Sequence, residues 1–135
     1  MPRKRFSGDP GDAIRFSSYG ESTPHLYVVV TPPDGNPPQV VIVNLTSKRR
    51  HSDTTVVLRP THHPFLDRET VVNFNKARIV RVETLMHRIE DGIAEAREAF
   101  SEDVLKVIQK GVLQSKRTPL HIQKYCRKFC GPQCQ

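Results

Sequence analysis

The sequence predicts an α+β fold, in which a small β-barrel or sandwich is followed by C-terminal helices. Two observations predict the strands: Val- and Ile-rich runs occupy residues 25–31 and 39–46, and segments rich in Pro, Gly, Asp and Asn separate such runs. A third observation predicts the helices, because apolar residues beyond position 83 recur every three or four residues. Short strands joined by close turns are typical of barrels and sandwiches.

The strands can be placed in chain order from their apolar runs and turn residues. The predicted segments are 11–16, 25–31, 39–46, 54–58, 70–74 and 77–82. In the first segment Ile14 and Phe16 alternate with polar residues and are expected to face inward. Arg59-Pro60 stops the fourth segment, and residues 62–66 show no periodicity, so we expect a loop there.

Three helices are predicted after the strands. The first is marked by apolar residues at helical spacing, with one glycine that would split the pattern: Met86, Ile89, Gly92, Ile93 and Ala96. Ser101 is placed to cap the second helix, which has acidic residues in its first turn. Thr118-Pro119 is a favourable start for the third helix, and Gly131 would end it.

With 135 residues, the chain has the length of one domain. We therefore divide it into a flexible basic tail over 1–10, a barrel over 11–82, and a helical C-terminal extension over 83–135 that packs on the barrel. There is no apolar run of transmembrane length and no apolar core of a signal peptide, so we expect no membrane partner and a cytoplasmic location.

Basic residues exceed acidic ones, with 21 Lys and Arg against 14 Asp and Glu and a formal net charge of +7. This balance favours an anionic partner, of which nucleic acid is the commonest. The chain has no Trp, so an aromatic stacking platform for single strands is not expected.

The three cysteines lie in the last ten residues and, with a histidine, form an H-x4-C-x3-C-x3-C pattern: His121, Cys126, Cys130 and Cys134. Structural zinc sites use tighter Cys pairs, and Gly131-Pro132 should break the helix before the last cysteine. We expect buried thiols, no metal and no cofactor; a zinc-stabilised C-terminal adaptor is the alternative that these cysteines leave open.

The order of elements over about residues 11–85 resembles the PemK/MazF-like toxins, which are small endoribonucleases of toxin–antitoxin modules. The resemblance is carried by a Gly-Asp opening strand at 11–14, an apolar strand at 26–31 that ends in Thr, an apolar strand at 41–47 that ends in Leu-Thr-Ser, and the Val-x-x-Leu turn that closes 71–85. It implies an SH3-like β-barrel with accessory helices, RNA as substrate and an antitoxin protein as partner. A homodimer is left open.

The chain departs from that family at one position. The toxins usually carry a catalytic Arg before Pro at the start of the second strand, whereas this chain has Pro24-His25. A guanidinium stabilises a charged phosphorane, but an imidazole can also carry protons near neutral pH. The change therefore either alters how the catalytic work is divided or marks a protein that no longer cuts RNA.

RNA transesterification needs a base for the 2′-OH, an acid for the leaving 5′-oxygen, and donors or a cation for the phosphorane. His25 is the first candidate for acid or base. Thr46 and Ser47 are candidates to donate hydrogen bonds to phosphate oxygens, a role that the resemblance implies for the Thr. His63 is a second imidazole candidate, which Pro64 restricts to an extended backbone.

The remaining candidates are basic residues expected to bind phosphates rather than to catalyse: Lys48, Arg49, Arg50, Lys76, Arg78 and Lys124. The sequence thus predicts a sequence-selective, metal-independent endoribonuclease toxin that a partner protein neutralises. The alternative is a non-catalytic barrel module that binds nucleic acid or another protein through the same face.

Overall fold

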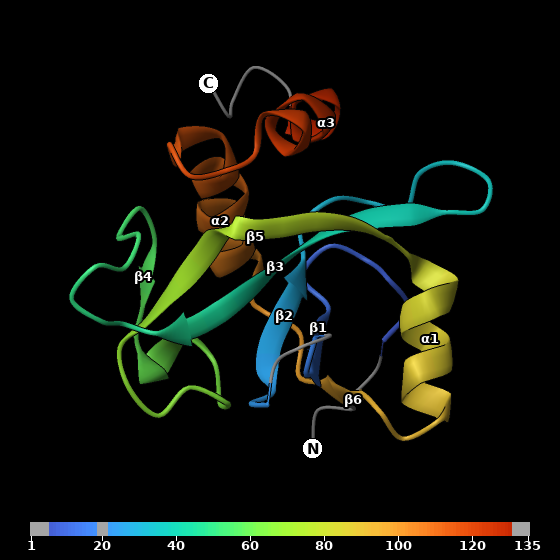
Figure 1. Cartoon of the computed structure of the whole chain (residues 1–135), viewed down its shortest axis with the longest axis horizontal. Coiled ribbons are helices and arrows are strands. Elements are labelled where there is room, and N and C mark those ends of the chain that lie inside the picture. The colour runs from blue at the N-terminus through green and yellow to red at the C-terminus, as the bar shows by residue number, and fades with distance from the viewer. Residues whose placement is uncertain (1–5, 19–21, 131–135) are drawn as a thin grey trace.

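A computed structural model describes residues 6–18 and 22–130, and its six strands form one curled antiparallel half-barrel sheet (Figure 1). The sheet order is β4-β5-β3-β2-β1-β6. The strands are β1 (Ala13–Phe16), β2 (His25–Val29), β3 (Gln39–Ser47), β4 (Val57–Leu58), β5 (Thr70–Arg81) and β6 (Glu95–Arg97). The helices are α1 (Val82–Glu90), α2 (Glu102–Gln114) and α3 (Leu120–Cys130), and a 3-10 turn covers Pro60–His62. The α+β prediction is confirmed, with helices after the main strands.

The apolar runs form two cores because successive residues of a strand point to opposite faces of the sheet. On β3, Val41, Val43 and Leu45 belong to the core that also contains Ile108 of α2 and Ile122 of α3. The neighbouring residues Val40 and Ile42 belong to a second core, which includes Leu85 of α1. Both faces of the central strands are therefore covered, which explains why their sequences are continuously apolar rather than alternating.

Helix α2 packs very closely on the sheet at one glycine. A Cβ added at Gly111 would lie 2.6 Å from Val56 Cγ2 and 2.7 Å from Phe74 Cζ. Gly111 thus permits a close approach of the helix instead of ending it, and α2 continues to Gln114. The predicted cap of this helix is confirmed, since the Ser101 hydroxyl accepts a hydrogen bond from the Val104 N–H at 3.3 Å.

The two extended segments predicted at 70–74 and 77–82 form a single twelve-residue strand, β5. Its pairing with β3 shifts register between Ile42 and Asn44, which face Arg78 and Asn73 respectively. The extra residues of β5 bulge out there, and Lys76 in the bulge is exposed. The fourth predicted strand is shorter than expected, because only Val57 and Leu58 pair with β5.

The helical pattern predicted across 86–96 is wrong in its second half. Helix α1 ends at Glu90, and Gly92 adopts a left-handed φ of 75°. The Ile93 N–H donates to Arg88 O and the Gly92 N–H donates to Ile89 O, which is the Schellman arrangement that closes a helix at glycine. Residues 95–97 then pair with β1 as an edge strand, so the 83–135 extension is not wholly helical.

Of the tail predicted over 1–10, residues 1–5 lie outside the described residues, as does Gly131, the predicted end of α3. Phe6 is not part of a flexible tail, because its side chain is buried in the second core. In the described ranges, none of the helices combines the length and apolar character needed to cross a membrane.

Candidate functional site

The candidate site lies where β2 begins and β3 ends, at one end of the two central strands of the sheet. The register that pairs Leu26 with Leu45 brings His25, the first residue of β2, beside Thr46, near the end of β3. Pro24 precedes the strand, where its missing N–H removes no hydrogen bond from the sheet. Both His25 and Thr46 are half-buried, since the strands leave the core at this point.

A pocket of about 200 Å³ opens at this end of the two central strands. The ends of the two strands form one wall, and the connection before β5 forms the other. Its lining residues are Thr23, Pro24, His25, Leu26, Leu45, Thr46, Ser47, Arg49, Phe65, Leu66, Asp67 and Thr70. Three of the four predicted catalytic residues, His25, Thr46 and Ser47, are thus brought together.

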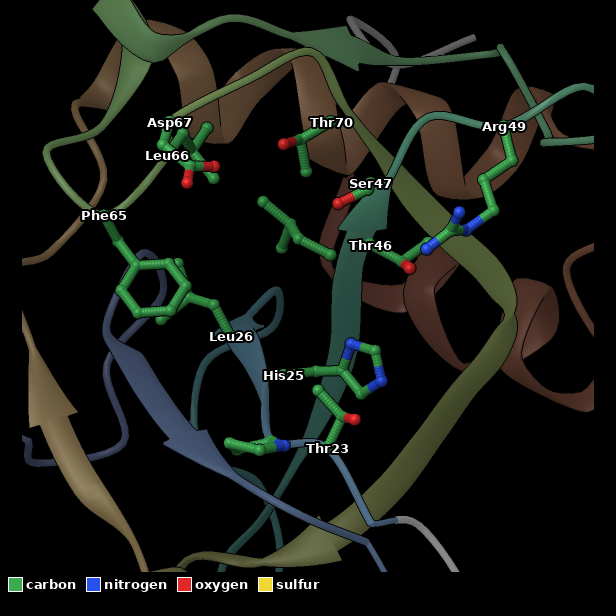
Figure 2. A pocket seen from close by; sticks show the side chains of 12 residues that line it. Thr23, His25, Leu26, Thr46, Ser47, Arg49, Phe65, Leu66, Asp67 and Thr70 are labelled. Carbon is green, nitrogen blue, oxygen red and sulfur yellow. The ribbon is translucent and has the colours of Figure 1, made fainter.

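Strand β3 divides the pocket-lining side chains into two groups. Figure 2 shows the side chains of His25, Thr46 and Arg49 on one side of β3. The side chains of Ser47 and Leu26 lie on the other side, as the alternation of strand residues requires. A histidine, a hydroxyl and a guanidinium therefore line the same side of the pocket, whereas the hydroxyl of Ser47 lines the other side.

The second group faces the connection that precedes β5. Ser47 pairs with Thr70 across the β3–β5 ladder, and Asp67 and Phe65 complete this side (Figure 2). The Thr70 hydroxyl donates to the carbonyl of Arg68 at 3.0 Å. A hydrogen bond from the Arg68 guanidinium holds the pKa of Asp67 below its ordinary value, so this exposed carboxylate is ionised at neutral pH.

His63 does not join this group, and its prediction as a catalytic imidazole is not supported by its surroundings. Only 3% of its surface is exposed, and its ring stacks on Phe100 with centroids 4.3 Å apart. Nδ1 accepts a hydrogen bond from the Phe65 N–H at 3.0 Å, so the proton lies on Nε2, which donates to Glu98 O at 2.6 Å. Burial lowers the pKa of His63, which favours this neutral form.

His63 therefore acts as a fixed link between the connection before β5 and the segment after β6. The predicted extended backbone is confirmed, with φ −164° and ψ 140°. The link is strengthened by the Arg97 guanidinium, which lies 4.9 Å from the centre of the Phe65 ring. Together these contacts hold Phe65 and its neighbours at the pocket wall.

Three of the predicted phosphate-binding residues lie away from the pocket. Arg78 is half-buried: its Nη2 donates to Ser18 Oγ at 2.9 Å, and its guanidinium lies 5.6 Å from the centre of the Tyr27 ring. Lys76 is exposed in the bulge of β5, and Lys124 is exposed on α3. Arg78 thus has a packing role, while the two lysines remain available to a ligand elsewhere on the surface.

The other three, Lys48, Arg49 and Arg50, start the loop that follows β3, which we call the 48–53 loop. All three are exposed, and Arg49 also lines the pocket. Lys48 Nζ lies 3.6 Å from Glu69 Oε1, a contact whose screening by solvent leaves it weak. The predicted basic residues therefore continue directly from the pocket along the surface.

Of the four side chains in the cysteine pattern, the structure describes those of His121 and Cys126. Cys126 is buried in the first core, and burial raises the pKa of its thiol to about 12. His121 on the same helix is exposed. Cys134 lies outside the described residues, within which no three His, Cys, Asp or Glu side chains gather closely enough to hold a metal ion.

The pocket residues missed by sequence reasoning are Thr23, Phe65, Asp67 and Thr70. All lie in loops or at a strand start, where hydrophobic periodicity carries no signal, and only the tertiary fold brings them to β3. Comparison of the chain with protein families, with curated proteins and with solved structures found no match.

Proposed function

We propose that the chain is a divergent PemK/MazF-like endoribonuclease, which cleaves RNA by metal-independent transesterification at the edge where β2 begins and β3 ends. The observation that carries the proposal is the meeting of His25, Thr46 and Arg49 on one side of β3. They supply a proton carrier, a hydrogen-bond donor and a cation, which are three of the groups that the reaction uses.

Each group has a distinct role in the proposed reaction. His25 removes the proton from the 2′-OH or donates one to the leaving 5′-oxygen, and solvent water in the open pocket carries out the other of these two proton transfers. Attack of the 2′-oxygen on phosphorus forms a cyclic 2′,3′-phosphate and breaks the bond to the 5′-oxygen, so no water is consumed in this step. Thr46 donates a hydrogen bond to a non-bridging phosphate oxygen, and the Arg49 guanidinium stabilises the added negative charge.

Arg49 also offers an answer to the departure of this chain from the toxin family. The guanidinium that the family carries at the start of the second strand is replaced here by His25, and Arg49 would supply a guanidinium to the same pocket from the loop that follows β3. We further propose that the curled sheet is an SH3-like barrel in the sense of that family. The protein would act in the cytoplasm and be neutralised by an antitoxin protein.

The test is an RNA cleavage assay with a mixed-sequence substrate and excess chelator. We expect products that end in a 2′,3′-cyclic phosphate and a 5′-hydroxyl, and no cleavage of DNA of the same sequence, because DNA lacks the attacking 2′-OH. A His25→Ala preparation, purified in parallel, controls for contaminating nuclease. RNA binding without cleavage by the wild type would instead support the non-catalytic binding module.

A further inference from the structure

Two segments that are distant in sequence form one basic surface beside the site. The 48–53 loop brings Arg49 and Arg50, and the connection between α2 and α3 brings Lys116 and Arg117. All four side chains are exposed. We call these four residues the basic path.

The two segments are joined by direct contacts. Arg117 Nη1 donates to the carbonyl of His51 at 3.0 Å. Ser115 Oγ donates to Asp53 Oδ2 at 2.5 Å, and the Arg117 N–H in turn donates to Ser115 Oγ at 3.1 Å. In Figure 1 the loop that leads from β3 to β4 accordingly lies beside the end of α2 where the chain turns towards α3.

The loop is also ordered along its length. At its base the Lys48 N–H donates to Glu69 O at 3.1 Å. Its tip is a turn, in which the Ser52 N–H donates to Arg49 O and the Arg49 N–H donates to Ser52 Oγ. A ligand that binds the loop would therefore meet a preorganised row of cations and lose less free energy to ordering them.

The basic path keeps an excess of positive charge, although the carboxylate of Asp53 offsets part of the charge of Arg117. Burial acts to raise the pKa of Asp53, but hydrogen bonds from Ser115 and Thr55 outweigh this and lower it, so the carboxylate is charged. Its oxygens are engaged by these hydroxyls, and only 9% of the residue is exposed. Glu69 lies against Lys48, which is not a member of the path. A surface of this kind suits a chain of phosphates.

We infer that the strand of RNA on one side of the cleaved bond leaves the pocket at Arg49 and follows the basic path to Lys116 and Arg117. This inference rests on the proposed function for its starting point. The cations would contact phosphates and not bases, so the path would add affinity for longer substrates without adding sequence preference. Short substrates would occupy only the pocket and would not reach the basic path.

The test uses 2′-O-methyl oligoribonucleotides, which cannot be cleaved, with lengths of 4 and 12 nucleotides. Loss of one phosphate contact on a single strand should reduce the salt slope of log affinity by about 0.7 and weaken binding about 4-fold near physiological salt. We therefore expect Arg50→Gln/Lys116→Gln to bind the 12-mer roughly 15-fold more weakly, with a slope smaller by about 1.4. Its affinity for the 4-mer should change much less.

Arg81→Gln is the matched control, because Arg81 is exposed and lies at the opposite end of β5 from the site. An unchanged salt slope for the 12-mer in the double variant would overturn the inference. So would a double variant that binds both RNAs like the wild type but has lost affinity for poly-glutamate, since the surface would then suit an acidic protein.

The proposed function has a separate readout, which is cleavage by the wild type. If the wild type cleaves RNA while the double variant keeps the full salt slope, the proposed reaction is supported and RNA binding along the basic path is refuted. If the wild type cannot cleave RNA but the double variant binds the 12-mer more weakly as expected, RNA binding along the basic path is supported and the proposed reaction is refuted.

Discussion

His25 and His63 lie in two regions of the molecule that use the same side chain differently. His25 is half-buried at the edge of a pocket, beside a hydroxyl and a guanidinium that come from the end of the next strand. His63 is buried, stacks on Phe100, and has hydrogen bonds at both ring nitrogens. An imidazole that exchanges protons with a ligand must be reachable by it, and only the surroundings of His25 meet this requirement.

The two regions are also connected, because His63 accepts a hydrogen bond from Phe65, which lines the pocket beside His25. The loop that His63 holds in place ends in Phe65, Leu66 and Asp67, and these residues form the pocket wall opposite β3. One histidine thus stabilises the wall of a site, and the other is a candidate to act in it. Four predictions separate these roles, and they are ordered by the size of the expected effect.

The largest effect is expected for His25→Ala. Loss of a general acid or base typically lowers a rate by about 10²–10⁴-fold, so cleavage should nearly disappear. The free energy of unfolding should fall by about 1 kcal/mol, as is usual for a point substitution, because His25 is half-buried where β2 begins. Single-turnover cleavage and urea unfolding measure the two quantities. A variant that cleaves at the wild-type rate would remove His25 from the mechanism.

His63→Ala should show the opposite pattern. It removes the stacking on Phe100 and leaves Glu98 O and the Phe65 N–H without their partner, so we expect a loss of roughly 2–4 kcal/mol in the free energy of unfolding. Urea unfolding is the measurement, with His121→Ala as control because His121 is exposed on α3. Equal stability of the two variants would contradict the structural role of His63.

Thr46→Val keeps the shape of the side chain and removes its hydroxyl. If Thr46 donates to a phosphate oxygen, cleavage should slow by about 10-fold, which is the contribution of one hydrogen bond. Folding should be nearly unaffected, because Thr46 is half-buried and Val suits a strand. Ser47→Ala serves as comparison, since Ser47 lies on the other side of β3. A larger loss in Ser47→Ala would place the phosphate on that side instead.

The smallest effect is a pH dependence of stability. Burial lowers the pKa of His63 in the folded state, so the unfolded chain takes up a proton there first as the pH falls through about 6.5. The free energy of unfolding should therefore decrease between about pH 6.5 and the lower pKa of the folded state. Urea unfolding at a series of pH values should show this loss in the wild type and a shallower one in His63→Ala.

The strands were predictable because each central strand is a continuous apolar run between turn residues. The first half of the 86–96 pattern was also correct, since α1 follows its helical spacing to Glu90. Its second half failed because Ile93 and Ala96 have helical spacing while Ala94 and Ala96 have the spacing of a strand, so the local pattern fits both. The pairing of residues 95–97 with β1 decides between them, and that pairing joins segments about 80 residues apart.

The site was predictable only in part, for a similar reason. His25 opens an apolar strand, and Thr46 and Ser47 close another one. Polar residues at the ends of apolar runs can be recognised in the sequence. Nothing local distinguishes His63 from His25, because burial and the partners Glu98 and Phe100 come from a distant segment. Arg117 was missed for the same reason, as its partner His51 is 66 positions away.

The tie between the 48–53 loop and the connection after α2 also bears on how the chain is completed during synthesis. Asp53 and Ser115 are separated by 62 positions, and His51 and Arg117 by 66. Before residues 115–117 are made, the first five strands, which end at Arg81, can already be present without this tie. Closing so long a loop costs entropy, so the segment beside the site takes its final position only after residue 117 has been made.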